Sequence, residues 1–326
     1  MNFDNYRKEL GAFIRKTRQE QGLSLQQLIR KKDPLRPAVS ENTLRGVEDA
    51  TTNAKQETIT IIFDLLGKTM GDFAYALENE SKVKFANDTK LINDLIRAGQ
   101  YQQAKEQYLK LKEETYCNLQ DTRVQQLFAS YEGVFLDRLE GEQEQALNTL
   151  LKGLLLRRPE LFIKRKRKIT LELDIAAIEK IALERVDYRM LVNIASIQFS
   201  VGQREMAVEL QESVITSLNF QLILIELREE MLSWVYFNLS NHLLELGMYG
   251  RALVICQQGV DVHKKNKTSR YLGELYSNMG EVYGKKNDKK RAHNHYKLAV
   301  EQFVRDNELD KAEITKNGRL MLMVST

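Results

Sequence analysis

Apolar residues among the first 77 positions recur at intervals of three or four, in short runs separated by polar turns. This spacing puts the apolar residues of each run on one face of an amphipathic helix. The predicted helices carry, in order, Leu10, Phe13 and Ile14; Leu25, Leu28 and Ile29; Thr43, Leu44 and Val47; Ile59, Ile62, Phe63 and Leu66; and a fifth helix that starts near Met70. Gly22 is expected to end the first helix, and Ser24 and Ser40 are good N-caps for the next two.

Two prolines, Pro34 and Pro37, must end the second helix, because proline lacks the backbone donor and its ring clashes with the preceding turn. The third helix is small and polar on one face. Short helices in this arrangement describe a helix-turn-helix module, in which the second helix of the pair lies in the DNA major groove.

The segment Val39–Glu48, with the sequence VSENTLRGVE, resembles the recognition-helix segment of the phage-repressor-type (Xre-like) helix-turn-helix. Leu23, Ser24 and Leu28 match the start of the preceding helix in that family. The resemblance implies that Glu48 pairs with an arginine of the first helix, and the candidates are Arg15 and Arg18.

We expect both helices of this module to contact DNA. The candidates for reading bases or contacting phosphates are Ser40, Asn42, Thr43 and Arg45. Ser24 and Gln26, at the start of the preceding helix, are expected to contact backbone phosphates. Two such heads in a homodimer would read a two-fold operator with half-sites about one helical turn, or a multiple of it, apart. The alternative is a five-helix packing module that does not bind DNA.

The rest of the chain contains an internal repeat, Gly-x-x-x-x-Ala, and each copy follows one amphipathic helix and opens another. The copies are Gly99…Ala104, Gly141…Ala146, Gly202…Ala207, Gly247…Ala252 and, with Asn in the glycine place, Asn287…Ala292. Gly or Asn takes the left-handed conformation at the end of a helix, and the Ala lets the second helix approach the first. The spacing therefore predicts a solenoid of helix pairs.

The last copy resembles a tetratricopeptide repeat (TPR). Around Asn287 and Ala292 it carries Met279-Gly280-Glu281-Val282-Tyr283, Tyr296 and Ala299. The predicted fold class is all-α. A helix-turn-helix domain in residues 1–78 is followed, in residues 79–326, by a right-handed superhelical array of about five TPR-like helix pairs.

Stacked helix pairs form a concave groove, which commonly accepts an extended peptide. An asparagine amide both donates and accepts, so it suits the unpaired backbone groups of such a peptide. Asparagine is also a poor helix former, so its use inside a helix needs a reason. The residues nine positions before each junction are Lys90, Glu132, Asn193, Asn238 and Asn278.

The candidates for peptide binding are therefore Asn193, Asn238 and Asn278, together with Asn241 and Arg189. Asn241 lies one turn beyond Asn238, and Arg189 lies four residues before Asn193, where its guanidinium would hold a peptide carboxylate. The alternative is that these amides cap or bridge neighbouring helices.

A helix-turn-helix joined to such an array resembles the RRNPP family of Gram-positive peptide-pheromone receptors, and its Rgg-like and PrgX-like transcription regulators in particular. The resemblance implies a regulator that dimerises or forms a tetramer. It would bind a double-stranded DNA operator and a short signalling peptide, in quorum sensing, conjugation or competence control. Two alternatives stay open: a TPR-type scaffold, and a phosphatase-type peptide receptor that binds a protein partner instead of DNA.

Composition agrees with a helical, cytoplasmic protein. The 326 residues include 3 prolines and 17 glycines, fewer than average, and 2 cysteines, which are too far apart for a disulfide framework or a zinc cluster. The sequence contains no stretch of 18 apolar residues, which a membrane-spanning helix would need. The net charge of +4 permits nucleic-acid binding without requiring it.

Two segments have open roles. Arg157, Arg158 and the run Lys164–Lys168 fall in the longest step between repeats, where we expect a solvated connector, or alternatively a second contact to phosphates. The apolar residues 320–324 form a C-terminal tail that either packs on the last repeat or acts as a ligand-sensing arm, as the resemblance to PrgX-like receptors implies.

The motifs of the sequence do not indicate an enzyme. Gly67-Lys68-Thr69 resembles the end of a phosphate-binding loop, but Ile62 replaces the required first glycine. His293 and His295 are two residues apart, so on a helix they face different sides. We expect no enzyme activity, no cofactor and no metal, and we assign Trp234 to the core of a repeat.

Overall fold

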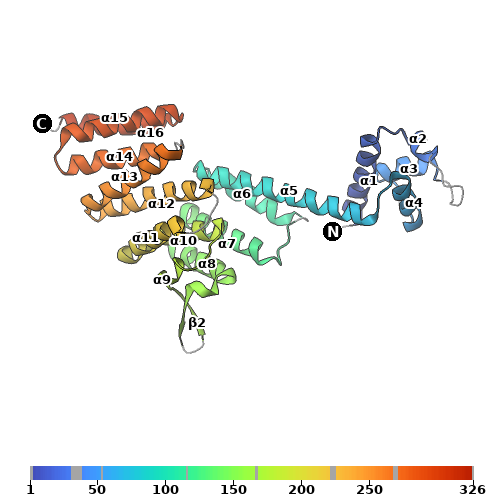
Figure 1. The fold of residues 1–326 in the computed structure, drawn as a ribbon, viewed down its shortest axis with the longest axis horizontal. Coiled ribbons are helices and arrows are strands. Elements are labelled where there is room, and N and C mark those ends of the chain that lie inside the picture. Colours follow the sequence, from blue (N-terminus) through green and yellow to red (C-terminus); the bar gives the residue numbers. More distant parts are fainter. Residues whose placement is uncertain are drawn as a thin grey trace. The chain divides into compact units, whose positions relative to one another are not determined.

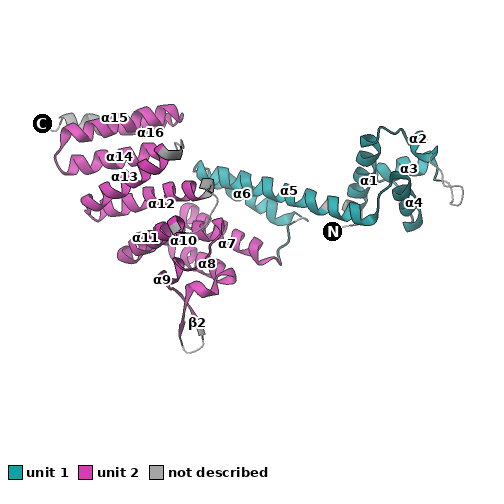
Figure 2. Cartoon of the chain, in the orientation of Figure 1, with its two compact units in different colours: residues 1–119 teal, residues 120–326 magenta. Residues whose placement is uncertain are grey.

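The computed structural model describes residues 3–30, 39–52, 54–114, 117–165, 168–220, 225–266 and 271–324. The chain divides into two compact units, residues 1–119 and residues 120–326 (Figure 2). Within the described residues, no helix combines the length and the apolar composition that a bilayer span requires.

Unit 1 begins with short helices that follow the predicted pattern (Figure 1). They are α1 (Phe3–Glu20), α2 (Leu25–Arg30), α3 (Glu41–Glu48), α4 (Gln56–Leu66) and the first turns of α5 (Met70–Arg97). Their buried core consists of Leu10, Ile14, Leu28, Val39, Leu44, Val47, Ile62, Phe63, Leu66 and Phe73, of which Val39 and Phe73 were not among the residues selected by spacing. Phe13, Leu25, Ile29 and Ile59, which the spacing also selects, are partly buried against this core. Gly22 ends α1 with φ +67°, as predicted, and the two prolines lie outside the described residues.

Helix α5 continues out of this head and pairs with α6 (Tyr101–Glu113). Thr69 starts α5 with a capping box, in which its side chain accepts from the backbone N–H of Asp72 and the Asp72 carboxylate accepts from the backbone N–H of Thr69. The predicted domain boundary between residues 78 and 79 falls inside this continuous helix, and the functional division there stays a prediction.

Unit 2 is a series of antiparallel helix pairs. They are α7 (Thr122–Phe135) with α8 (Gln143–Arg157), α10 (Arg185–Ser200) with α11 (Arg204–Phe220), α12 (Ile225–Glu245) with α13 (Tyr249–Asn266), and α14 (Leu272–Lys285) with α15 (Lys289–Arg305), followed by α16 (Leu309–Val324). The short α9 (Ile175–Ile178) precedes α10. The first helices of successive pairs contact one another in the order α7, α10, α12 and α14.

Every predicted junction residue is left-handed. The φ angles are +74° at Gly99, +72° at Gly141, +92° at Gly202, +71° at Gly247 and +61° at Asn287. The alanine five residues after each junction is buried. Asn307 (φ +60°) and the buried Ala312 repeat the device between α15 and α16, where it was not predicted from the sequence. The all-α class and the array of helix pairs are confirmed.

The longest step between repeats contains a β-hairpin, which was not predicted from the sequence. After a 3-10 turn at Pro159–Leu161, strand β1 (Phe162–Arg165) pairs antiparallel with β2 (Lys168–Leu173). The run Ile169-Thr170-Leu171-Glu172-Leu173 alternates apolar and polar residues, which is a strand pattern. The five basic residues Lys164–Lys168 directly precede this alternation, and such a charged run is typical of a solvated connector.

The C-terminal residues 320–324 are part of α16 and do not follow it as a separate tail. Their side chains lie outside the described part of the chain, so their packing and their role stay predictions.

Arg157 and Arg158 belong to a polar network that joins α7, α8 and α10. Arg157 binds Glu184 with two hydrogen bonds of 2.7 and 3.0 Å, and Arg158 Nε donates to the fully buried Asp187 at 2.7 Å. Gln126 Nε2 donates to the other oxygen of Asp187 at 2.6 Å. These two arginines are therefore structural, which corrects their assignment to a solvated connector.

The network is sensitive to acid. The hydrogen bonds from Arg157 lower the pKa of the Glu184 carboxyl below its usual value. A carboxyl whose pKa is lower in the folded state stabilises that state at neutral pH. This stabilisation is lost as the pH falls through the lowered pKa.

We expect Asp187→Ala to lower the free energy of unfolding of unit 2 by about 3–5 kcal/mol, because the buried Asp187 carboxylate accepts from Arg158, Gln126 and the backbone N–H of Glu184. Arg158 would keep only its longer contacts to Glu184 and Glu160. Arg185→Ala is the control, since it removes only the partly exposed ion pair with Glu230 and is expected to cost about 1 kcal/mol or less. Urea unfolding followed by the fluorescence of Trp234 measures both. Equal losses in the two variants would contradict the assignment.

Candidate nucleic-acid interface and peptide-binding helices

Helix α3 presents its first turns to solvent. Ser40 is its N-cap: the Ser40 hydroxyl accepts from the backbone N–H of Thr43 at 3.0 Å and is 2.8 Å from the Thr43 hydroxyl. Ser40, Asn42 and Arg45 are exposed and Thr43 is half-buried, whereas Leu44 on the other side of the helix lies in the core. The structure thus brings the four predicted residues together on the outer side of α3.

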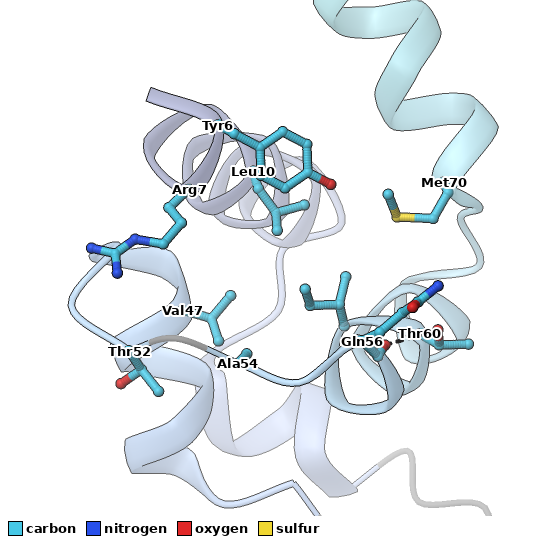
Figure 3. Close-up of a pocket in the computed structure, with 10 residues that line it drawn as sticks. Tyr6, Arg7, Leu10, Val47, Thr52, Ala54, Gln56, Thr60 and Met70 are labelled. Atoms are coloured by element: carbon cyan, nitrogen blue, oxygen red, sulfur yellow. Dashed lines mark hydrogen bonds between the residues drawn. The ribbon is translucent and has the colours of Figure 1, made fainter. Parts of the chain in front are cut away.

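A pocket of about 280 Å³ lies between α1, the end of α3, and α4 (Figure 3). Its lining is mainly apolar and includes Leu10, Val47, Ile59 and Met70. None of the six residues predicted to contact DNA lines it. The pocket is therefore separate from the exposed side of α3.

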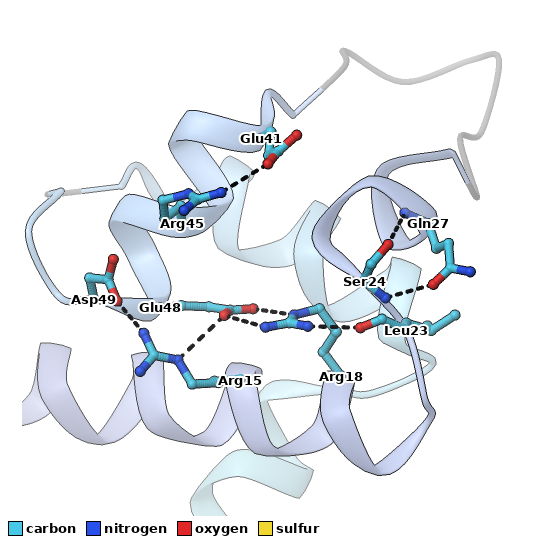
Figure 4. A network of polar contacts seen from close by, with 9 residues as sticks. All are labelled: Arg15, Arg18, Leu23, Ser24, Gln27, Glu41, Arg45, Glu48 and Asp49. Carbon is cyan, nitrogen blue, oxygen red and sulfur yellow. Dashed lines mark hydrogen bonds and ion pairs between the residues drawn. The ribbon is translucent and has the colours of Figure 1, made fainter.

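A buried ion pair fixes α3 to α1 (Figure 4). Arg18 Nε and Nη2 donate to the two carboxylate oxygens of Glu48 at 2.7 and 2.8 Å, and Arg18 Nη1 donates to the Leu23 carbonyl at 2.7 Å. The hydrogen bonds to Glu48 raise the pKa of Arg18. Arg15 adds a longer contact of 3.5 Å to Glu48 and an ion pair with Asp49. The predicted pairing of Glu48 with a first-helix arginine is confirmed.

Glycine allows α1 and α3 to approach closely. A Cβ atom at Gly11 would lie 2.5 Å from the carbonyl oxygen of Val47 and 2.8 Å from that of Glu48. Backbone atoms cannot move aside as the end of a flexible side chain does. This role of Gly11 was not predicted, because nothing in the local sequence pattern shows which helix it will meet.

The start of α2 is capped reciprocally. The Ser24 hydroxyl accepts from the backbone N–H of Gln27 at 3.1 Å, and the Gln27 side chain accepts from the backbone N–H of Ser24 at 2.7 Å. Ser24 and Gln26 are both exposed. The capping role predicted for Ser24 is confirmed. The role of Gln27 was not predicted, although the Ser-x-x-Gln spacing is typical of a capping box.

Arg45 is tied only weakly to its own helix. It donates to Glu41, four residues earlier, at 3.0 Å, and the two side chains are 60% and 36% exposed. Such exposed pairs contribute little free energy. Arg45 can therefore exchange this partner for another acceptor at small cost.

The five residues predicted to bind peptide lie on neighbouring helices of unit 2. Arg189 and Asn193 are on α10, Asn238 and Asn241 on α12, and Asn278 on α14. Since α12 contacts both α10 and α14, the three helices form a continuous surface. Lys90 lies on α5 in unit 1, where it pairs with Asp94, and Glu132 lies on α7.

The asparagines have different surroundings. Asn278 is buried and donates to the Asn241 side-chain oxygen at 2.6 Å and to the Ser240 hydroxyl at 2.8 Å, so it bridges α14 and α12. Asn238 is half-buried and donates to the Trp234 carbonyl of its own helix at 3.1 Å. Asn278 therefore bridges two neighbouring helices, which is the alternative to peptide binding that the sequence leaves open for these asparagines.

Asn193 keeps its amide available. It is half-buried in the middle of α10, and within the described part of the chain its side chain makes no hydrogen bond. One turn earlier, the guanidinium of Arg189 lies 5.8 Å from the centre of the Tyr131 ring on α7. Asn193 is therefore the candidate with a free donor and a free acceptor on this surface.

No family model matches the chain, and no curated protein is similar to it in sequence. Solved structures do match. PlcR from Bacillus thuringiensis, in its complex with the peptide PapR7 and DNA, matches 96% of this chain and 99% of its own length, with a TM-score of 0.56 and 17% identity. The apo form of PlcR matches 95% and 98%, with a TM-score of 0.62 and 17% identity.

The fold is PlcR-like. PlcR is an RRNPP-family protein, so the resemblance predicted from the sequence is confirmed at the level of the fold. The match covers the helix-turn-helix, the repeats and the helix between them. Which residues of this chain contact DNA or peptide stays a prediction.

We expect Glu48→Ala to destabilise the PlcR-like head by about 3 kcal/mol, because Arg18 would stay largely buried without its carboxylate. Hydrogen-exchange mass spectrometry of the full chain should show faster exchange in α2 and α3. Glu41→Ala, which removes an exposed pair, is the control and should leave exchange nearly unchanged. Unchanged exchange in Glu48→Ala would show that the pair does not hold α3.

Proposed function

We propose that this chain is a DNA-binding transcription regulator controlled by a short peptide. The observation that supports the proposal is a PlcR-like fold over nearly the whole chain. In this fold the ion pair of Arg18 with Glu48 holds the inner side of α3 against α1, and the polar side of α3 is exposed. The matched PlcR structure contains both a peptide and DNA.

In this proposal α3 enters the major groove of an operator. Arg45 and Asn42 have the side chains that pair with guanine and adenine edges, respectively. Ser40 and Thr43 lie at the N-terminal end of α3, where free backbone N–H groups and the helix dipole favour a phosphate. Ser24 and Gln26 contact phosphates from the start of α2. A homodimer, or a tetramer built from it, would present two heads to a two-fold operator.

The peptide lies along α10, α12 and α14. Asn193 offers its donor and acceptor to the peptide backbone, and Asn238 continues the contact on α12. Arg189 holds a carboxylate. Asn241 and Asn278 bridge α12 and α14 and so fix the spacing of these two helices. They also contact the peptide at its edge.

Peptide binding changes the populations of two arrangements of the heads. A ligand shifts such an equilibrium only by the difference in its affinity for the two states. The peptide must therefore contact at least two helices whose separation differs between those states. Such a regulator acts in the cytoplasm, where its operator is, and needs no catalysis, cofactor or metal.

The operator test starts from a genomic pull-down with the purified chain. We expect one palindromic sequence to be enriched, and Arg45→Ala to weaken its binding by about 1–3 kcal/mol, as for the loss of a bidentate base contact. Thr43→Ala should also weaken it. Lys82→Ala, which removes an exposed charge from α5, is the control. Retention of no specific DNA, with or without peptides, would favour a protein-binding scaffold.

The peptide test uses fractions of culture supernatant, with the fluorescence of Trp234 as readout, because this single tryptophan lies one turn from Asn238. Asn193→Ala and Asn238→Ala should each weaken binding by about 1–3 kcal/mol, the cost of leaving a polar partner unpaired. Asn294→Ala, on the exposed side of α15, should not. Equal binding by all variants would make these asparagines structural.

A further inference from the structure

The pocket between α1, the end of α3, and α4 has an apolar floor (Figure 3). Leu10 and Val47 in this floor are each 4% exposed, and Ile59 is half-buried beside them. The volume of about 280 Å³ lies just below the range of about 300–1,000 Å³ that is usual for small-molecule pockets. Water in an apolar hollow has few hydrogen-bond partners, so the apolar atoms of a small ligand would fill this floor better than water.

The charge of the pocket comes from one side chain. Among the described residues that line it, Arg7 alone carries a charge, and none is acidic. Arg7 and Thr52 lie at one end of the pocket, and Met70 lies at the other (Figure 3). The occupant that fits is therefore elongated, with one negative charge at the Arg7 end and an apolar body that extends towards Met70.

The guanidinium of Arg7 is positioned by the backbone that follows α3. Its Nη2 donates to the Ala50 carbonyl at 3.0 Å. A guanidinium has five N–H donors in a planar fork, so it can bind a carboxylate and keep a backbone acceptor at the same time. Ala50 has φ +56°, a left-handed conformation that is uncommon for a residue with a Cβ atom. Strained residues of this kind cluster at ligand-binding sites.

We propose that this pocket binds a small amphipathic monocarboxylate, such as a medium-chain fatty acid. The carboxylate lies on Arg7, and the apolar chain lies along Leu10, Val47 and Ile59. A dianion such as a phosphate monoester fits less well, because one arginine leaves its second charge without a partner. The site is separate from the helices proposed to bind peptide, and its occupation does not depend on DNA binding.

An occupant of this pocket contacts α3 on its inner side. Val47 is in the last turn of α3. A Cβ atom at Gly46 would collide with the side chain of Thr52, so this wall of the pocket packs tightly against the helix. The backbone N–H groups of Thr51 and Thr52 both donate to the Gly46 carbonyl, at 2.9 and 3.0 Å. Because a ligand stabilises the state that binds it, occupation should slow the local opening of α3.

The test titrates the full chain, without DNA, with sodium octanoate in isothermal titration calorimetry. Octanoate should bind about 15-fold more tightly than hexanoate, which has two fewer methylenes to bury. Octylammonium, of the same length and opposite charge, should not bind. Hydrogen-exchange mass spectrometry with saturating octanoate should show slower exchange in α1, α3 and the start of α4.

Variants of the lining separate the charge of the pocket from its apolar floor. Arg7→Gln should weaken octanoate binding by about tenfold or more, and Arg7→Lys should recover part of the loss, because it keeps a cation. Ala54→Leu adds an apolar side chain to the pocket without changing its charge, and should also weaken binding. Lys8→Gln removes an exposed cation of α1 that does not line the pocket, so it is the control and should bind as the wild type does. Exchange of α3 in each ligand-free variant shows whether the head is folded.

Equal octanoate affinity in Arg7→Gln and the wild type would overturn the proposal, and so would an equal loss in Lys8→Gln. Binding of octylammonium as tight as that of octanoate would also overturn it, since the site would then read no charge. Slower exchange confined to α10, α12 and α14 would overturn it by placing octanoate on the helices proposed to bind peptide. The proposed function is decided separately, by operator binding in the absence of octanoate.

Discussion

Each helix pair of this chain depends on one residue held in the left-handed conformation and on a buried alanine five residues later. The left-handed residue ends the first helix without strain when it is Gly and with little strain when it is Asn. The alanine then lets the second helix pack closely. Because the device repeats, residues at the same distance from each junction lie at the same level on α10, α12 and α14. Asn278 is thereby equivalent to Asn238, and its amide reaches Asn241, one turn beyond that position on α12.

The head achieves a fixed geometry by other means. A largely buried pair such as Arg18 with Glu48 adds little net stability over an apolar contact, but its loss is costly and its geometry is specific. Together with the close approach at Gly11, it sets the position of α3 on α1. The outer side of α3 keeps only an exposed pair, Arg45 with Glu41. A rigid inner side and a weakly occupied outer side suit a helix that must exchange its own contacts for those of a ligand.

The sequence could predict what depends on local spacing. The helices of the head, the capping roles of Ser24 and Ser40 and the five left-handed junctions all follow from short patterns, whereas the pairing of Glu48 with the first helix was implied by the resemblance to the Xre-like family. Contacts between distant segments could not be read in this way. Register placed Asn193, Asn238 and Asn278 at equivalent positions, but only packing shows that Asn278 turns to α12 while Asn193 keeps a free amide. The hairpin could not be predicted with the same ease, because the alternation of Ile169, Leu171 and Leu173 is short and directly follows five adjacent cations that are typical of a solvated connector.

The basic residues between positions 157 and 168 show how packing separates one sequence feature into two. Arg157 and Arg158 end α8 beside Glu184 and Asp187, so their charges are compensated inside the fold. Pro159 stops the helix there, and the chain leaves the core as a strand after Phe162. In that strand Arg165 pairs with Glu172 of the hairpin and not with the acids beside α8. Closeness in the sequence therefore does not give these cations one role, because the helix end at Pro159 decides which of them meet the acids of α10.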